Sequence, residues 1–240
     1  MTPDEKKIEL EKIKPFHLLG GTFTEKNISD IYSKYKIPPQ LQTHQLRVAA
    51  VANLICNNIS NFLETRIVIQ TCLVHDMGNI IKSNLDAFPE FLEPQGKKYW
   101  QDAKDEFIKK YGDDEHLASI TIARELGLSE RVINIIDRIN FSKAVENSRL
   151  PDLATKICVY SDARVSPKSV SSLKERLDES YARNHNDPGK IQSNPILYKA
   201  AAEAMFAMEK EIFSNSNLKP TDVTTEKLEE IITNLELFEI

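Results

Sequence analysis

The residues whose types best suit chemistry in this sequence are an adjacent histidine and aspartate, His75 and Asp76. They close an apolar run over residues 67–74 that predicts a buried helix. Neighbouring side chains on a helix point roughly 100° apart, so the two do not simply hydrogen-bond side by side. Both can still reach one ion near the helix end. An imidazole nitrogen with a carboxylate oxygen suits Mn, Fe, Co, Ni or Zn better than Ca, and Gly78 leaves room for a backbone or a substrate to come close.

Two other polar side chains interrupt predicted apolar helix faces. Alone, His75 could be a core histidine bonded to a carbonyl, and Asp76 an acid at a helix end. Asp162 lies one turn beyond Cys158 on a small apolar face, where an unpaired carboxylate would be costly, so it needs a metal or an arginine as its partner. His44 interrupts a stripe that otherwise consists of Leu41, Val48, Val51, Ile55 and Ile59, either as a hydrogen-bonded core histidine or as a metal ligand directed into the interior. Four residues with metal-ligand chemistry on three predicted helices are hard to explain as structural residues alone.

The elements that carry these residues are predicted to be helices. Seven glycines in 240 residues is a low number, and apolar residues recur mostly at helical spacing, which indicates an all-α protein. A chain of this length can bury one core and does not need two, so we expect one domain over residues 1–240. Its core would cover about residues 38–170, with additional N-terminal helices and a C-terminal helical extension over residues 171–240.

Caps, prolines and glycines predict the helix boundaries. The expected N-caps include Thr24, Asp113 or Asp114, and Ser129. Residues 83–111 would form a helical insertion after the His-Asp helix, either a lid over a pocket or a surface hairpin, and residues near 169–184 an exposed helix rich in charge. The expected helices cover residues 4–14, 24–35, 38–60, 64–82, 97–111, 113–126, 129–140, 151–162, 169–184, 195–213 and 221–240.

Charge and cysteine content restrict the partners and the compartment. A net charge of -5 gives no broad attraction to nucleic-acid backbones. The three cysteines, Cys56, Cys72 and Cys158, are far apart within apolar runs, which is typical of core residues in a reducing compartment. No apolar run in the sequence approaches membrane-spanning length. We therefore expect a soluble, cytoplasmic protein that binds neither nucleic acid nor membrane, and a homodimer is compatible with the sequence.

The order His, His-Asp, Asp on successive helices of an all-α core resembles the HD-domain superfamily of metal-dependent phosphohydrolases. Three stretches carry the resemblance: residues 43–48 (THQLRV), 73–79 (LVHDMGN) and 159–165 (VYSDARV). It covers roughly residues 38–170, which is more than half of the chain. The resemblance implies an HD-type helical bundle and a metal site, and it leaves the substrate open.

The same resemblance implies a ligand set and a reaction. One divalent transition metal (Mn, Fe, Co, Ni or Zn, with Mg compatible) would be ligated by His44, His75, Asp76 and Asp162. Such an ion lowers the pKa of bound water and polarises a phosphoryl oxygen, so that hydroxide attacks phosphorus. The substrate would be a small phosphate ester, a nucleotide or a related metabolite, with Asp76 also catalytic. His116, in the first turn of a helix, would protonate the leaving oxygen; an exposed helix-start histidine is the alternative.

One departure from the family pattern concerns a second metal. Dinuclear members, including mixed-valent di-iron oxygenases, carry two histidines between the His-Asp pair and the last Asp. This chain has only His116 there, and Asn140 stands where the second histidine is expected. A neutral amide is a poor ligand for a transition metal, which argues against a second metal and against oxygen chemistry.

A second departure concerns phosphate binding. A lysine often follows His-Asp-x-Gly in this superfamily, but here Asn79 takes that position and Lys82 comes three residues later. Arg47, Lys82 or Arg164 would then cover the phosphate charge, with Asn79 beside them; a surface salt bridge is the alternative for each cation. Two other functions therefore stay open. One is a non-catalytic HD module that senses a nucleotide or scaffolds a partner, and the other, less favoured, is a di-iron oxygenase.

Overall fold

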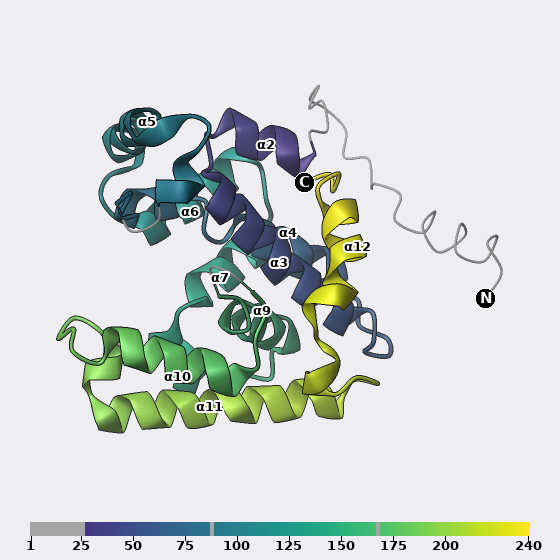
Figure 1. Cartoon of the computed structure of the whole chain (residues 1–240). Coiled ribbons are helices and arrows are strands. Elements are labelled where there is room, and N and C mark those ends of the chain that lie inside the picture. Colours follow the sequence, from purple (N-terminus) through teal and green to yellow (C-terminus); the bar gives the residue numbers. More distant parts are fainter. Residues whose placement is uncertain (1–26, 87–88, 167–168) are drawn as a thin grey trace, which may run out of the picture.

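A computed structural model of the chain describes residues 27–86, 89–166 and 169–240 (Figure 1). These residues form eleven α-helices and several short 3₁₀ helices, with isolated β-bridges and no strand among them. The predicted all-α class is confirmed. The α-helices are α2 (Ile28–Lys34), α3 (Pro39–Cys56), α4 (Thr65–Val74), α5 (Gly96–Tyr111), α6 (Glu115–Glu125), α7 (Glu130–Arg138), α8 (Ala144–Arg149), α9 (Leu153–Ala163), α10 (Leu173–Asn184), α11 (Pro195–Ser214) and α12 (Thr225–Leu235).

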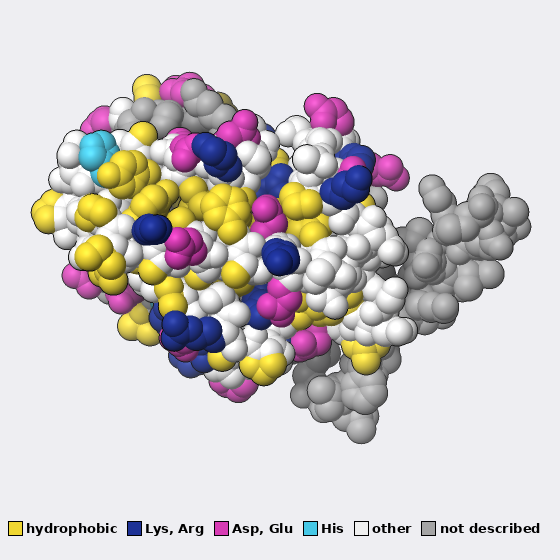
Figure 2. Space-filling model, turned by 90° about the horizontal axis from the view of Figure 1, so that it is seen from below, with side chains coloured by type: hydrophobic (Ala, Val, Ile, Leu, Met, Phe, Trp, Pro, Cys, Tyr) yellow, Lys and Arg dark blue, Asp and Glu magenta, His cyan; other side chains and the backbone are white. Residues whose placement is uncertain are grey.

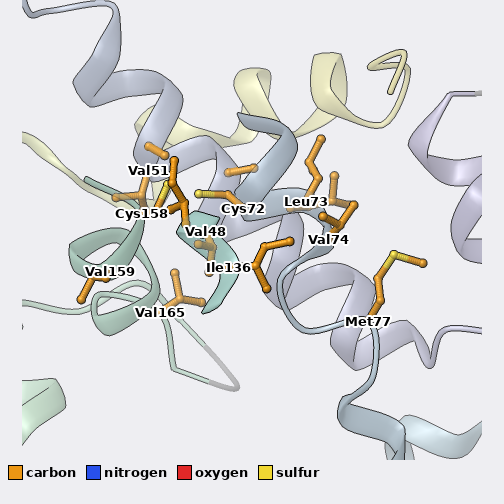
Figure 3. Packing of buried hydrophobic residues seen from close by; sticks show 14 of the residues in the cluster. Val48, Val51, Cys72, Leu73, Val74, Met77, Ile136, Cys158, Val159 and Val165 are labelled. Atoms are coloured by element: carbon orange, nitrogen blue, oxygen red, sulfur yellow. The ribbon is translucent and has the colours of Figure 1, made fainter. Parts of the chain in front are cut away.

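Three helices, α3, α4 and α9, pack against one another at the centre of the fold, and α7 packs against α4 and α9. Each fully buried aliphatic side chain there stabilises the fold by about 1.5–3 kcal/mol. All three cysteines are free and buried, as expected of core residues. Figure 3 shows side chains of these helices meeting in the core, among them Val48, Val51, Cys72, Ile136, Cys158 and Val159. This core fixes the helix ends that carry the polar residues of interest.

The remaining helices surround this centre (Figure 1). α12 lies along α3, while α5 and α6 pack on the 3₁₀ helix Asn79–Lys82. α10 and α11 lie side by side. Tyr198 of α11 joins them: its hydroxyl donates to the Leu177 carbonyl of α10 at 2.8 Å, and the Tyr198 ring lies 5.0 Å from the ring of Tyr181. α10 also contacts α9, which places the charged helix next to the core rather than apart from it.

The helix that precedes the His-Asp pair is shorter than predicted. α4 ends one residue before His75 instead of continuing to Lys82, and a turn and the 3₁₀ helix Asn79–Lys82 follow. Gly78 lies in this turn, where a Cβ would lie 2.1 Å from the carbonyl oxygen of Glu115 on α6. The close approach anticipated at this glycine is therefore that of a backbone.

Several other boundaries follow the predicted signals. Asp114 and Ser129 are N-caps, since each side chain accepts a hydrogen bond from a backbone N–H within its helix. α3 ends at Cys56 rather than near residue 60. The predicted helix over residues 4–14 and the predicted cap Thr24 lie outside the described residues.

The insertion after the His-Asp pair lies against the rest of the fold. Trp100 is buried and its indole N–H donates to the carbonyl of Leu92 at 3.0 Å. The 3₁₀ helix Pro89–Leu92 contacts α3, and α5 contacts the 3₁₀ helix Asn79–Lys82. Leu85 and Leu92 line a cavity that opens beside His44. Part of the insertion is thus a wall of that cavity.

The surface is mixed in character. Figure 2 shows apolar side chains gathered between charged ones on the face seen from below, and α11 exposes Ile196, Leu197 and Phe206. A homodimer would need apolar surface of this kind, and that partner stays a prediction. None of the described helices combines the length and the apolar composition that crossing a membrane requires.

Candidate metal centre

Two histidines and two carboxylates from three helices meet at one point. His44 lies on α3, Asp162 lies near the end of α9, and His75 with Asp76 directly follows α4. Nε2 of His44 is 3.1 Å from Oδ1 of Asp162 and 3.6 Å from Oδ2 of Asp76. Nε2 of His75 is 3.4 Å and 3.7 Å from the same two oxygens. We call these four residues the ligand group.

The spacing of three members of the ligand group, His44, His75 and Asp76, could hold a single metal ion. One ligand atom each of His44, His75 and Asp76 lies within 4.8 Å of the other two, and Asp162 adds an oxygen close to both histidines. Two ligands at about 2.1 Å from one ion are separated by about 3 to 4.2 Å, depending on the angle between them. Within the described residues no other cluster of three such side chains meets this condition.

The environment of His75 points to a missing partner. Its side chain is 2% exposed, and Nδ1 lies 2.9 Å from the carbonyl oxygen of Cys72, to which it donates. Nε2 is buried and has no hydrogen-bond partner. A histidine that donates from one nitrogen to a carbonyl and directs the other into a cluster of carboxylates has the arrangement of a metal ligand.

Electrostatics make the same point attractive to positive charge. Burial lowers the pKa of His75, but the carboxylates of Asp76 and Asp162 outweigh burial and raise that pKa to about 9. Burial likewise raises the pKa of Asp162, but the hydrogen bond with His44 and the charge of both His44 and His75 outweigh it and hold the pKa well below its ordinary range. In the absence of a metal, a proton therefore occupies this site, and a divalent cation would replace it.

Neighbouring residues fix the turn that carries His75 and Asp76. Gln45, buried on α3 next to His44, accepts the backbone N–H of Asp76 at 3.3 Å. The hydroxyl of Tyr32, fully buried on α2, donates to the carbonyl of Leu73 at 2.6 Å. The ligands are thereby held by the backbone on both sides of the end of α4, which is the preorganisation that a metal site needs.

A cleft opens at the ligand group. Two cavities of about 860 Å³ and 390 Å³ are both lined by His44 and Asp76, so we describe them as the larger and the smaller lobe of one cleft. Both lobes have a mixed lining. The larger lobe combines polar side chains such as Gln40, Asn79 and Asn84 with the apolar side chains of Leu41, Leu85 and Leu92. The smaller lobe combines Ile139, Phe141, Val159, Leu177 and Met205 with polar residues such as Asn140 and Ser180. A substrate held at the ligand group can therefore meet both polar and apolar side chains in either lobe.

Of the four residues predicted to bind substrate, two line the cleft and two do not. Asn79 lines the larger lobe, and Lys82 lines both lobes with its Nζ 3.2 Å from Oε1 of Glu115. Arg47 lines neither lobe. Arg164 is buried outside the cleft, where its guanidinium donates to the Tyr160 hydroxyl and to backbone carbonyls of residues 171, 220 and 223. The proposed contact of Arg164 with substrate is therefore not supported, because these neighbours already use its donors.

His116 is also outside the cleft. It lies in the first turn of α6 as predicted, with Nε2 3.7 Å from Oδ1 of Asp137, and lines neither lobe. Asn140 does line the smaller lobe; its side chain caps the 3₁₀ helix Phe141–Lys143.

Two arginines that the sequence reasoning did not select line both lobes. Arg176 and Arg183 lie on α10, next to His44 and Asp76 in the lining of the cleft. Their separation of seven residues puts them on one face of a helix, and this was the signal present in the sequence. It did not show that this face of α10 turns toward the metal centre.

No protein-family model, curated protein or solved structure matches this chain. The residues of the site and their geometry are thus the basis for assigning a function.

Proposed function

We propose that this protein is a metal-dependent phosphohydrolase that hydrolyses a small phosphate ester, such as a nucleotide or a related metabolite. One observation carries the proposal: the buried, unpartnered Nε2 of His75 faces two carboxylates and His44 at the junction of an open cleft. The order of these ligands along the chain resembles that of the HD-domain enzymes. The cations beside them suit an anionic substrate.

The ligand group would hold one divalent transition metal, which when bound supplies a Lewis acid and an acidified water. The carbonyl of Cys72 orients the ring of His75, so that the lone pair of the unprotonated Nε2 is available to the metal. Asp76 reaches the histidines through Oδ2, and its side chain is 26% exposed in the cleft, where its second oxygen can accept the proton of an attacking water. His116 lies outside the cleft, so the leaving oxygen takes its proton from solvent.

The test is phosphate release from a panel of nucleotides and sugar phosphates in the presence of Mn, Co, Ni, Mg or Zn. We expect metal-dependent release by the wild type and a fall below about one hundredth of that rate in Asp76→Ala. Asp86→Ala is the matched control, because Asp86 is an exposed carboxylate paired with Lys97 and does not line the cleft. Equal release by wild type and Asp76→Ala, with helix content unchanged in circular dichroism, would exclude the proposal.

A second function follows from the position of His116. Among the described residues, the cleft then has no imidazole outside the ligand group to act as a general acid, which favours a non-catalytic module that binds a nucleotide. A rise in the thermal midpoint with a nucleotide, together with no phosphate release under any metal, would support that function over hydrolysis. A di-iron oxygenase would need two irons per chain, which metal analysis of the purified protein measures.

A further inference from the structure

Three cations from two elements border the metal centre. Lys82 ends the 3₁₀ helix Asn79–Lys82, and Arg176 and Arg183 lie on α10. Each of the three lines both lobes of the cleft, as do His44 and Asp76. The metal ligands come from α3, α9 and the turn after α4, whereas both arginines come from the C-terminal extension.

Arg176 differs from an ordinary surface arginine. Its side chain is 16% exposed, and its Nε is buried without a hydrogen-bond partner. One of its terminal nitrogens donates to Oε2 of Glu179, three residues along the helix. A guanidinium has five N–H donors, so most of the donors of Arg176 remain for an anion in the cleft.

Glu179 brings the two arginines together. Its Oε2 accepts from Arg176, and its Oε1 lies 3.1 Å from a terminal nitrogen of Arg183. One carboxylate thus receives one guanidinium on each oxygen. A phosphate offers the same kind of acceptor with an additional oxygen and a larger charge, and arginine forks match its geometry.

We propose that Arg176 and Arg183, assisted by Lys82, bind the phosphate group of the substrate and select a phosphate that carries two negative charges. The inference rests on the proposed function in taking the ligand to be a phosphate ester. Coulomb energy scales with the product of the charges, so a terminal phosphate dianion competes with Glu179 for the arginines better than the monoanion of a phosphodiester does. The substrate class is then a phosphate monoester rather than a diester.

Isothermal titration of the full-length, metal-free protein with inorganic phosphate at about pH 8, where phosphate is mainly a dianion, tests this assignment. We expect binding by the wild type and a Kd at least about tenfold higher in Arg176→Gln and in Arg183→Gln. Lys174→Gln is the matched control, because Lys174 lies on the same helix, pairs with Asp178 and does not line the cleft. Dimethyl phosphate, a monoanion, should bind at least about tenfold more weakly than phosphate.

Several results would overturn the assignment: no binding of phosphate by the wild type, the same Kd in Arg183→Gln, or equal binding of dimethyl phosphate. Arg183 is half exposed, so its variant keeps the test valid if Arg176→Gln does not fold. The outcome is independent of hydrolysis. Phosphate binding that depends on the arginines, without phosphate release, would support the phosphate site and exclude the hydrolase function. Metal-dependent phosphate release that is unchanged in both arginine variants would support the hydrolase function and exclude the phosphate site.

Discussion

In the proposed metal centre a proton and a metal ion would compete for Nε2 of His75, so the affinity for metal should depend on pH. Burial lowers the pKa of this imidazole, but Asp76 and Asp162 together raise it to about 9. Below that value a metal has to displace the proton, and its apparent affinity should fall about tenfold for each pH unit. Between about pH 8 and pH 6 we therefore expect a loss of about a hundredfold.

Competition between the protein and a chromophoric chelator for Co²⁺ or Zn²⁺ measures this dependence. His75→Gln should bind metal weakly and with a shallower dependence on pH, because the competing proton is gone. His185→Gln is the control, since His185 is an exposed histidine that stacks on Tyr181 at the end of α10 and does not line the cleft. A wild-type affinity that is the same at both pH values would refute the role of His75 as a ligand.

The same group makes a prediction for the stability of the metal-free protein. Because the folded pKa of His75 lies above its ordinary value of 6.5, the stabilisation is fully present below pH 6.5 and is lost as the pH rises through 9. The interval from 6.5 to about 9 corresponds to about 3 kcal/mol of unfolding free energy. Urea unfolding at pH 6.5 and at pH 9 measures this loss. We expect the loss in the presence of EDTA and not with saturating metal, because the bound ion replaces the proton at both pH values. Equal stability of the metal-free protein at both values would contradict the pKa assigned to His75.

Two further predictions concern residues that position the ligands. Gly78→Ala should lower the unfolding free energy by about 1–3 kcal/mol in denaturant titration, because the added Cβ would lie 2.1 Å from the Glu115 carbonyl oxygen; an unchanged midpoint would mean that α6 shifts freely. Hydrogen bonds from Arg131 hold the pKa of Asp152 well below its usual range. Asp152 is also the N-cap of α9, where its side chain accepts from the backbone N–H of Thr155. The contribution of the Asp152 carboxylate to stability is therefore present above about pH 4 and is lost as the pH falls. Asp152→Asn should therefore cost about 1 kcal/mol near neutral pH and little in acid, and an equal cost at both would show that the charge does not matter.

The ligand group could be selected from the sequence because polar side chains on apolar helix faces are costly and therefore informative. His44 interrupts an apolar stripe of α3, and Asp162 lies on the small face of α9. The turn after α4 could not be predicted in the same way. It depends on the contact between Gly78 and the backbone of α6, which lies nearly forty residues further along the chain and has no local signal.

The role of a basic residue is harder to predict from sequence than that of a metal ligand. A lysine or arginine on a helix can lie on the surface, in a buried hydrogen-bond network or in a binding site. Arg164 directly follows α9, close in sequence to Asp162, yet it turns away from the cleft and binds the backbone of the C-terminal segment. Arg183 is 51% exposed and far along the chain, yet it lines the cleft. Only the packing of α10 against α9 distinguishes the two, and that packing is a tertiary property.

The candidate metal ligands and the cations of the cleft come from different parts of the chain. The central helices α3, α4 and α9 bring the metal ligands together, and their spacing along the chain carries the resemblance to metal-dependent phosphohydrolases. The cations that we propose as phosphate ligands come largely from α10, outside the segment over which that resemblance extends. Under that proposal, changes in α10 alter which phosphate ester binds without disturbing the ligand group, since Arg176 and Arg183 contact none of its residues through an ion pair or a hydrogen bond in the described part of the chain. We therefore expect replacement of these two arginines by glutamine to change the preference among substrates while the affinity for metal stays constant.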